Sequence, residues 1–116
     1  MSDTSPRSSR PPPPHIEPVV HDGVRYEQDM QSWRHGGTQA GGYLAAFDVA
    51  SGERLWMVKV YEVPSHEAFG VSTPGRYFRS LRRVPGRDEL AIENEAGGRF
   101  IVDLRTRVVR PGPPVP

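Results

Sequence analysis

The chain contains no cysteine, which excludes a disulfide framework and a thiolate metal site. It has no apolar run as long as a membrane span, and its N-terminus lacks the apolar segment of a signal peptide. We therefore expect a soluble, cytoplasmic protein that does not insert into membranes. A formal net charge of +1 predicts strong attraction neither to nucleic acid nor to an anionic lipid surface.

Large apolar side chains are scarce at both ends of the chain. Residues 1–18 offer only Met1 and Ile16 and include four consecutive prolines, so we expect a disordered or polyproline tail. Residues 110–116 repeat this proline-rich composition. A single domain is expected over residues 19–109, and a domain of that size buries so little surface that oligomerisation would help it.

Helical periodicity is nearly absent, whereas alternation with period two recurs between turn residues. This pattern predicts an all-β fold, a small antiparallel sandwich or barrel of about six short strands. The strands are expected at residues 23–28, 42–47, 53–63, 76–84, 89–93 and 99–104, with a short additional one at 107–109. The segment 53–63 is apolar on both faces, so we expect a second sheet or another subunit to cover each face.

One turn carries a recognisable spacing of residues. Ala46, Asp48, Ser51, Gly52 and Trp56 follow the pattern Ala-x-Asp-x-x-Thr-Gly-x-x-x-Trp, with serine in place of threonine. This arrangement resembles the repeat of the quinoprotein dehydrogenase-like β-propellers. The resemblance implies a hairpin whose Asp and Trp dock neighbouring blades; it implies no catalytic residue, and nothing here matches the quinone or calcium ligands of those enzymes.

A second copy of this hairpin is expected at residues 100–109. Asp103 takes the role of Asp48 and Thr106 that of Ser51, while the glycine and the tryptophan are missing. A closed propeller needs several four-stranded blades, and this chain can supply at most two. We therefore expect a self-contained sandwich or barrel that uses the same hairpin.

Motifs for catalysis are missing. No Gly-x-Ser-x-Gly elbow and no phosphate-binding glycine loop occurs, so we predict a non-enzymatic protein without a cofactor. His21, His35 and His66 are the metal-ligand candidates, with a carboxylate such as Asp22 or Glu67, although their spacing fits solvated loop histidines better.

Arginines gather in residues 76–87 without an acidic residue among them. Arg79, Arg82 and Arg83 adjoin Tyr77 and Phe78, a combination that can bind single-stranded nucleic acid. The same arginines can form a rim that pairs with the acidic residues at 88–95, within the chain or across a subunit boundary. The near-neutral charge of the chain favours the rim.

Our principal hypothesis is a non-catalytic domain for self-assembly or protein–protein interaction. Its predicted interface residues are Tyr43, Trp56, Tyr61, Phe78, Arg79, Arg82 and Arg83. An alternative hypothesis is a small-molecule or metal-binding module closed by the glycine-rich loops 28–42 and 64–75, with Trp33, His35 and His66 inside. Single-stranded nucleic-acid binding through residues 76–87 is a further alternative.

Overall fold

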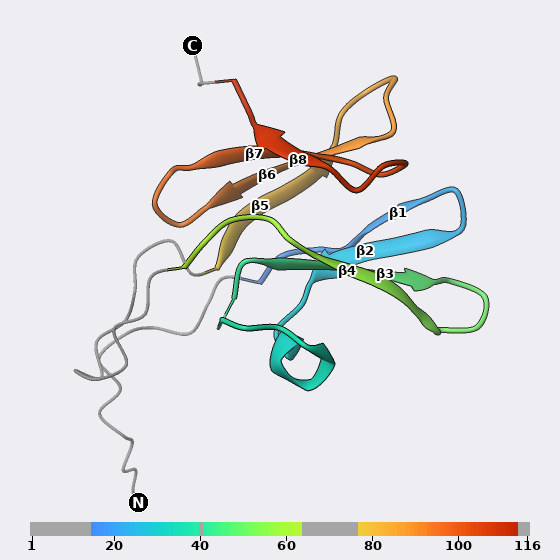
Figure 1. Cartoon of the computed structure of the whole chain (residues 1–116). Coiled ribbons are helices and arrows are strands. Elements are labelled where there is room, and N and C mark those ends of the chain that lie inside the picture. The colour runs from blue at the N-terminus through green and yellow to red at the C-terminus, as the bar shows by residue number, and fades with distance from the viewer. Residues whose placement is uncertain (1–14, 40, 64–76, 114–116) are drawn as a thin grey trace, which may run out of the picture.

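The computed structural model describes residues 15–39, 41–63 and 77–113. They form eight strands and one short 3₁₀ helix, η1 (Ser32–His35). The strands form two four-stranded antiparallel sheets, stacked as two layers in Figure 1. The all-β prediction is confirmed, with more strands than the six expected. The strands are β1 (Val19–His21), β2 (Val24–Gln28), β3 (Tyr43–Asp48), β4 (Arg54–Lys59), β5 (Phe78–Arg83), β6 (Glu89–Asn94), β7 (Arg99–Asp103) and β8 (Val109–Pro111).

Sheet 1 has the order β1-β2-β3-β4, so each strand pairs with its neighbour in sequence. The first hairpin, which the sequence reading missed, turns at Asp22 and Gly23, both with positive φ (54° and 75°). An Asp-Gly pair with two positive φ angles favours a two-residue hairpin, because its twist matches that of the flanking strands. Strand β1 therefore precedes the first strand expected.

Sheet 2 repeats this plan in the order β5-β6-β7-β8. Its last strand begins at Val109 and ends at Pro111, beyond the domain boundary expected at 109. At the other end, Ile16 packs against the hydrophobic core, although the sequence placed it in a tail. The folded unit is thus longer at both ends than predicted, whereas the expected tail residues 1–14 and 114–116 and the expected loop 64–75 lie outside the described residues.

The core lies between the two sheets and takes apolar side chains from both. Strand β4 ends at Lys59, earlier than the expected 63, and Tyr61 then enters the core. The ring of Tyr61 stacks on Phe100, with centroids 5.1 Å apart, and contacts Phe78 at 6.1 Å. Tyr61 and Val63 thus reach the same core as Trp56 and Val58. No helix within the described ranges is long and apolar enough to cross a membrane.

Candidate functional site

In both predicted copies of the aspartate turn, the side chain of the aspartate accepts a hydrogen bond from the amide three residues on. Asp48 Oδ2 accepts hydrogen bonds from Ser51 N (2.9 Å) and Ser51 Oγ (2.8 Å). Asp103 Oδ1 accepts hydrogen bonds from Arg105 N (2.8 Å) and Thr106 N (3.0 Å). These hydrogen bonds lower the pKa of both aspartates, because they stabilise the ionised form.

Arg107 occupies the position in the second turn that Gly52 has in the first. The amide of each donates to its aspartate carbonyl oxygen at 2.7 Å, and φ is 65° at Arg107 and 77° at Gly52. A positive φ is unfavourable for arginine. Its guanidinium lies 5.2 Å from the ring centroid of Trp56 in sheet 1, so the second turn touches the tryptophan of the first hairpin.

The two sheets turn opposite sides toward the core. Aligning the two turns, with Asp48 matched to Asp103, shows this. In sheet 1, Leu44 and Ala46 belong to the core and Phe47 points away from it. The residues 55 positions later have the opposite orientation: Arg99 and Ile101 line the outer side of sheet 2, and Val102 is in the core. The face that sheet 1 buries is therefore the face that sheet 2 leaves open.

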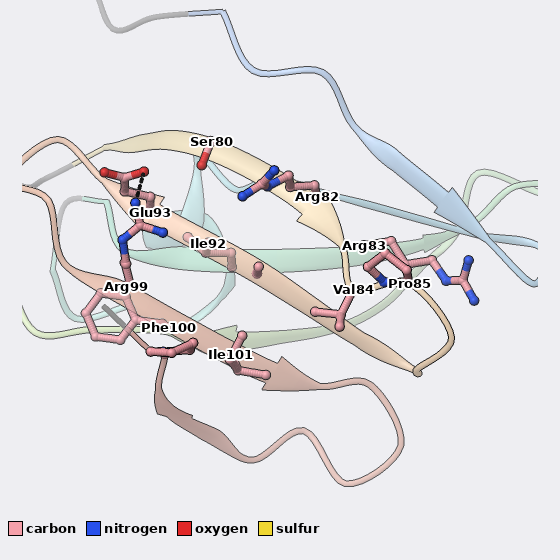
Figure 2. Close-up of a pocket in the computed structure, with 13 residues that line it drawn as sticks. Ser80, Arg82, Arg83, Val84, Pro85, Ile92, Glu93, Arg99, Phe100 and Ile101 are labelled. Carbon is pink, nitrogen blue, oxygen red and sulfur yellow. Dashed lines mark hydrogen bonds and ion pairs between the residues drawn. The ribbon is translucent and has the colours of Figure 1, made fainter. Parts of the chain in front are cut away.

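This open face of sheet 2 is hollowed into a groove of about 380 Å³ (Figure 2). Alternation along β6 and β7 sends Ala91, Glu93, Arg99 and Ile101 to this side, while the core residues Ile92 and Phe100 also line the groove. We call this groove, with its rim, the outer groove. It is lined by Ser80, Arg82, Arg83, Val84, Pro85, Ala91, Ile92, Glu93, Arg99, Phe100, Ile101, Gly112 and Pro113.

The arginines in the outer groove, and Arg79 beside it, differ in their partners. Glu93 forms ion pairs with Arg79 and with Arg99, the latter at 3.3 Å. Arg79, which donates a hydrogen bond to it, lowers the pKa of Glu93 most strongly. Within the described ranges Arg82 and Arg83 form no hydrogen bond or ion pair through their side chains, and both are exposed. The predicted rim of paired arginines is thus present for Arg79 and leaves Arg82 and Arg83 available.

The outer side of sheet 1 is partly covered by the loop that carries η1 (Figure 1). This loop is fixed by Asp29, which is 5% exposed and accepts a hydrogen bond from Arg54 at 2.9 Å. The hydroxyl of the buried Tyr43 also accepts a hydrogen bond from Thr38 N at 2.8 Å. Trp33 projects from the loop with 66% of its surface exposed.

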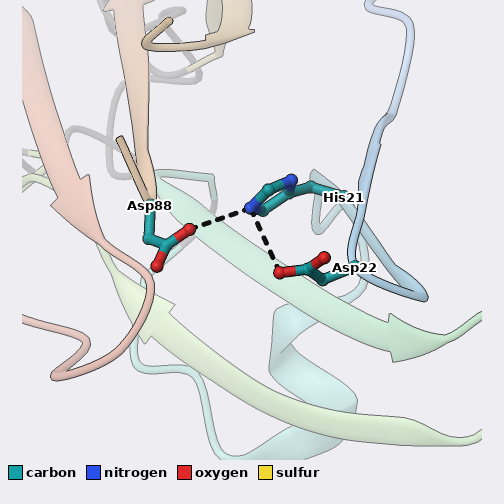
Figure 3. Close-up of side chains that lie close together, drawn as sticks. All are labelled: His21, Asp22 and Asp88. Carbon is teal, nitrogen blue, oxygen red and sulfur yellow. Dashed lines mark hydrogen bonds and ion pairs between the residues drawn. The ribbon is translucent and has the colours of Figure 1, made fainter. Parts of the chain in front are cut away.

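A second cluster connects the two sheets at the β1–β2 turn (Figure 3). His21 Nε2 lies 3.0 Å from Asp88 Oδ1 and 3.6 Å from Asp22 Oδ2. Among the described residues, this group alone has the geometry to hold a metal ion. One imidazole and two carboxylates form a donor set suited to a borderline or hard divalent cation.

The structure separates several predicted site residues. Tyr43, Tyr61 and Phe78 are buried inside the chain, at 5%, 8% and 0% exposure, and Trp56 is half-buried, so the predicted aromatic anchors stabilise the fold rather than face a partner. Phe78 is likewise closed to a stacking base. Trp33 and His35 are exposed instead of enclosed in a pocket. His66 lies outside the described residues, and His21 meets the predicted Asp22 but not His35.

Other residues of these sites were missed by the sequence reading. Asp88 was expected to pair with the arginines rather than with His21, and the groove residues Ala91, Arg99 and Ile101 were not singled out. Alternation along β6 and β7 was the available signal, since it assigns Leu90 and Val102 to one face and Ala91 and Ile101 to the other.

No protein-family model, curated protein or solved structure matches this chain. The fold and its sites define an all-β protein of two stacked four-stranded meanders with one open, grooved face.

Proposed function

We propose that this protein is a non-catalytic domain that self-associates through the outer sides of its two sheets. The observation that carries the proposal is the outer groove: sheet 2 leaves open the face that sheet 1 buries in the core. The resemblance of the aspartate turns to propeller repeats supports the same view, since such sheets stack face to face in series.

The chemistry of the outer groove favours a protein partner. It combines apolar residues, such as Val84, Pro85 and Ile101, with the exposed Arg82 and Arg83. Arginine is enriched in protein interfaces, where it pairs with aromatic side chains and carboxylates. A small apolar surface rimmed by charges is typical of reversible association.

Native mass spectrometry of the full chain at several concentrations, compared with its denatured mass, tests this proposal. We expect a defined oligomer without additional mass. A species that stays monomeric at every concentration contradicts self-association, and a monomer that carries a small-molecule adduct favours the ligand-binding alternative instead.

Divalent-cation binding is a second candidate, favoured by the cluster of His21, Asp22 and Asp88. The three donor atoms lie within 4.8 Å of one another and come from both sheets, so an ion bound there would crosslink the sheets. An ion that binds only the folded state raises the melting temperature.

Thermal unfolding with and without Zn²⁺ or Mn²⁺ tests this second candidate. We expect the metal to raise the melting temperature of the wild type and of a His35→Ala control, but not of His21→Ala. Equal melting temperatures of the wild type with and without metal would exclude the site.

A further inference from the structure

The proposed self-association leaves open which surfaces meet, and the two sheets differ in ways that bear on this. The outer side of sheet 2 is open and grooved, whereas that of sheet 1 is partly covered by the η1 loop. A contact between copies can therefore join two like sides or two unlike sides.

We propose that copies of this chain associate head to tail, with the outer groove of one copy binding the outer side of sheet 1, including Trp33, of the next. This inference rests on the proposed self-association and specifies its geometry. The partner is a second copy of the same chain.

The packing inside the chain supports this arrangement. Within one copy, the Leu44 and Ala46 face of sheet 1 meets the Val102 face of sheet 2. Because the two sheets repeat the same turn, the Arg99 and Ile101 side of sheet 2 corresponds to the first of these faces. If the outer side of sheet 1 from a second copy packed against it, the new contact would again join a side of the Leu44 type to a side of the Val102 type, as in the contact within one copy.

The two halves of the chain also carry opposite formal charges. Residues 15–63 contain seven acidic and four basic side chains, a formal charge of −3, whereas residues 77–113 contain five acidic side chains and eight arginines, a formal charge of +3. Head-to-tail contact joins halves of opposite formal charge. Of these charged groups, Asp29 is buried and paired with Arg54 and so does not itself face the groove. Contact between two copies of sheet 2 would instead oppose like charges.

Trp33 provides the anchor on the sheet 1 side. It is the most exposed large apolar side chain of the described residues, at 66%, and η1 lies on the side of sheet 1 away from sheet 2 (Figure 1). The guanidinium of Arg34 lies 4.9 Å from the ring centroid of Trp33, so the opposite face of the ring is the one that can gain cation–π attraction and apolar burial. Arg82, which has no ion pair in the described part of the chain, is positioned in the groove to receive it.

Two variants, each defective on one side, test the geometry. Trp33→Ala removes the anchor and Arg82→Glu alters the groove; both residues are exposed, so folding should be preserved. We expect each substitution to raise the dissociation constant about thirty-fold or more, the size of an interface hot spot. Val108→Ala and Arg105→Glu, exposed positions outside the groove, are the matched controls.

Mixing the two variants gives the decisive measurement by sedimentation velocity and native mass spectrometry. Each variant alone should be monomeric, and the mixture should form a 1:1 heterodimer, because one intact groove then meets one intact Trp33. Raising the salt from about 0.05 M to about 0.5 M should weaken the wild-type assembly, since the attraction is partly between exposed charges.

The alternatives give different results. A wild-type assembly that survives both substitutions, or that responds only to Arg82→Glu, would overturn the head-to-tail geometry while leaving self-association in place. A mixture that stays monomeric would also overturn the geometry. A monomeric wild type would overturn both proposals.

Discussion

The two sheets are built on the same plan and differ in which face they bury. Leu44 of sheet 1 is fully buried in the core, whereas Arg99, at the corresponding position of sheet 2, lines the open groove. The difference shows that the neighbouring layer, rather than the strand itself, decides whether a position is apolar.

The two turns show a second difference. Gly52 adopts a positive φ without strain, and Arg107 adopts one although it has a Cβ atom. The contact of Arg107 with Trp56 offsets this cost, so a position that favours glycine in one turn supports the contact between sheets in the other.

The largest difference between the two sheets is expected when side chains at corresponding positions are truncated and the free energy of unfolding is compared. Leu44→Ala should lower the free energy of unfolding by about 2–5 kcal/mol, because it leaves a cavity in the core. Arg99→Ala should lower it by about 1 kcal/mol, since its ion pair with Glu93 is only half-buried beside the open groove. Urea denaturation measures both, and equal losses would contradict the assignment of faces.

Exchanging residues between the two turns should have a smaller effect. Gly52→Ala should lower the free energy of unfolding by about 1 kcal/mol through its positive φ alone, because the added Cβ meets no atom within 4 Å.

Arg107→Ala, which keeps the strain and loses the Trp56 contact, should lower it by about 0.5–1 kcal/mol. Arg107→Gly loses the contact but relieves the strain, so its stability should stay within about 0.5 kcal/mol of the wild type. A marked gain in stability from Arg107→Gly would show that the Trp56 contact contributes nothing.

The hydrogen bond between His21 and Asp88 joins the sheets at one point, and removing it tests how far the layers depend on polar contacts. His21→Ala should lower the free energy of unfolding by about 1 kcal/mol. A double-mutant cycle with Asp88→Ala should give a coupling energy of similar size. Additive losses would show that the two side chains do not interact in solution.

Acid should weaken both turns in the same way, with the smallest effect. Because the pKa values of Asp48 and Asp103 are lowered in the folded state, their stabilising contribution is complete above about pH 4, near the pKa of an unfolded aspartate, and is lost as the pH falls through the folded values. Asp48→Asn combined with Asp103→Asn should therefore flatten the fall in stability between about pH 4 and pH 2. An unchanged pH profile would contradict this role.

Local patterns predicted much of the fold. Alternation and turn residues gave the all-β class, and the spacing around Asp48 and Asp103 gave both turns. Three-residue strands are too short for alternation to place them: β1 was missed, although Asp22-Gly23 was a usable signal for it, and the strand expected at 107–109 begins two residues before β8.

The candidate site was harder to predict. The groove depends on which side of sheet 2 packs against sheet 1. The strands of sheet 1 lie about 55 residues away in the sequence, so local patterns within sheet 2 do not reveal that side. Tyr43, Tyr61 and Phe78 were predicted to face a partner because aromatic residues fit interfaces, but the same property suits the core that they fill. The contact between His21 and Asp88 joins residues 67 positions apart, beyond the reach of local patterns.

Every strand in this fold pairs with the strand next to it along the chain. Forming either sheet therefore requires only local loops to close, the longest of them the η1 loop between β2 and β3, which favours rapid folding because little chain entropy is lost before each contact forms. Neither sheet can bury its apolar face by itself, so we expect hairpins to appear early and a slower docking of the two preformed layers to limit the folding rate.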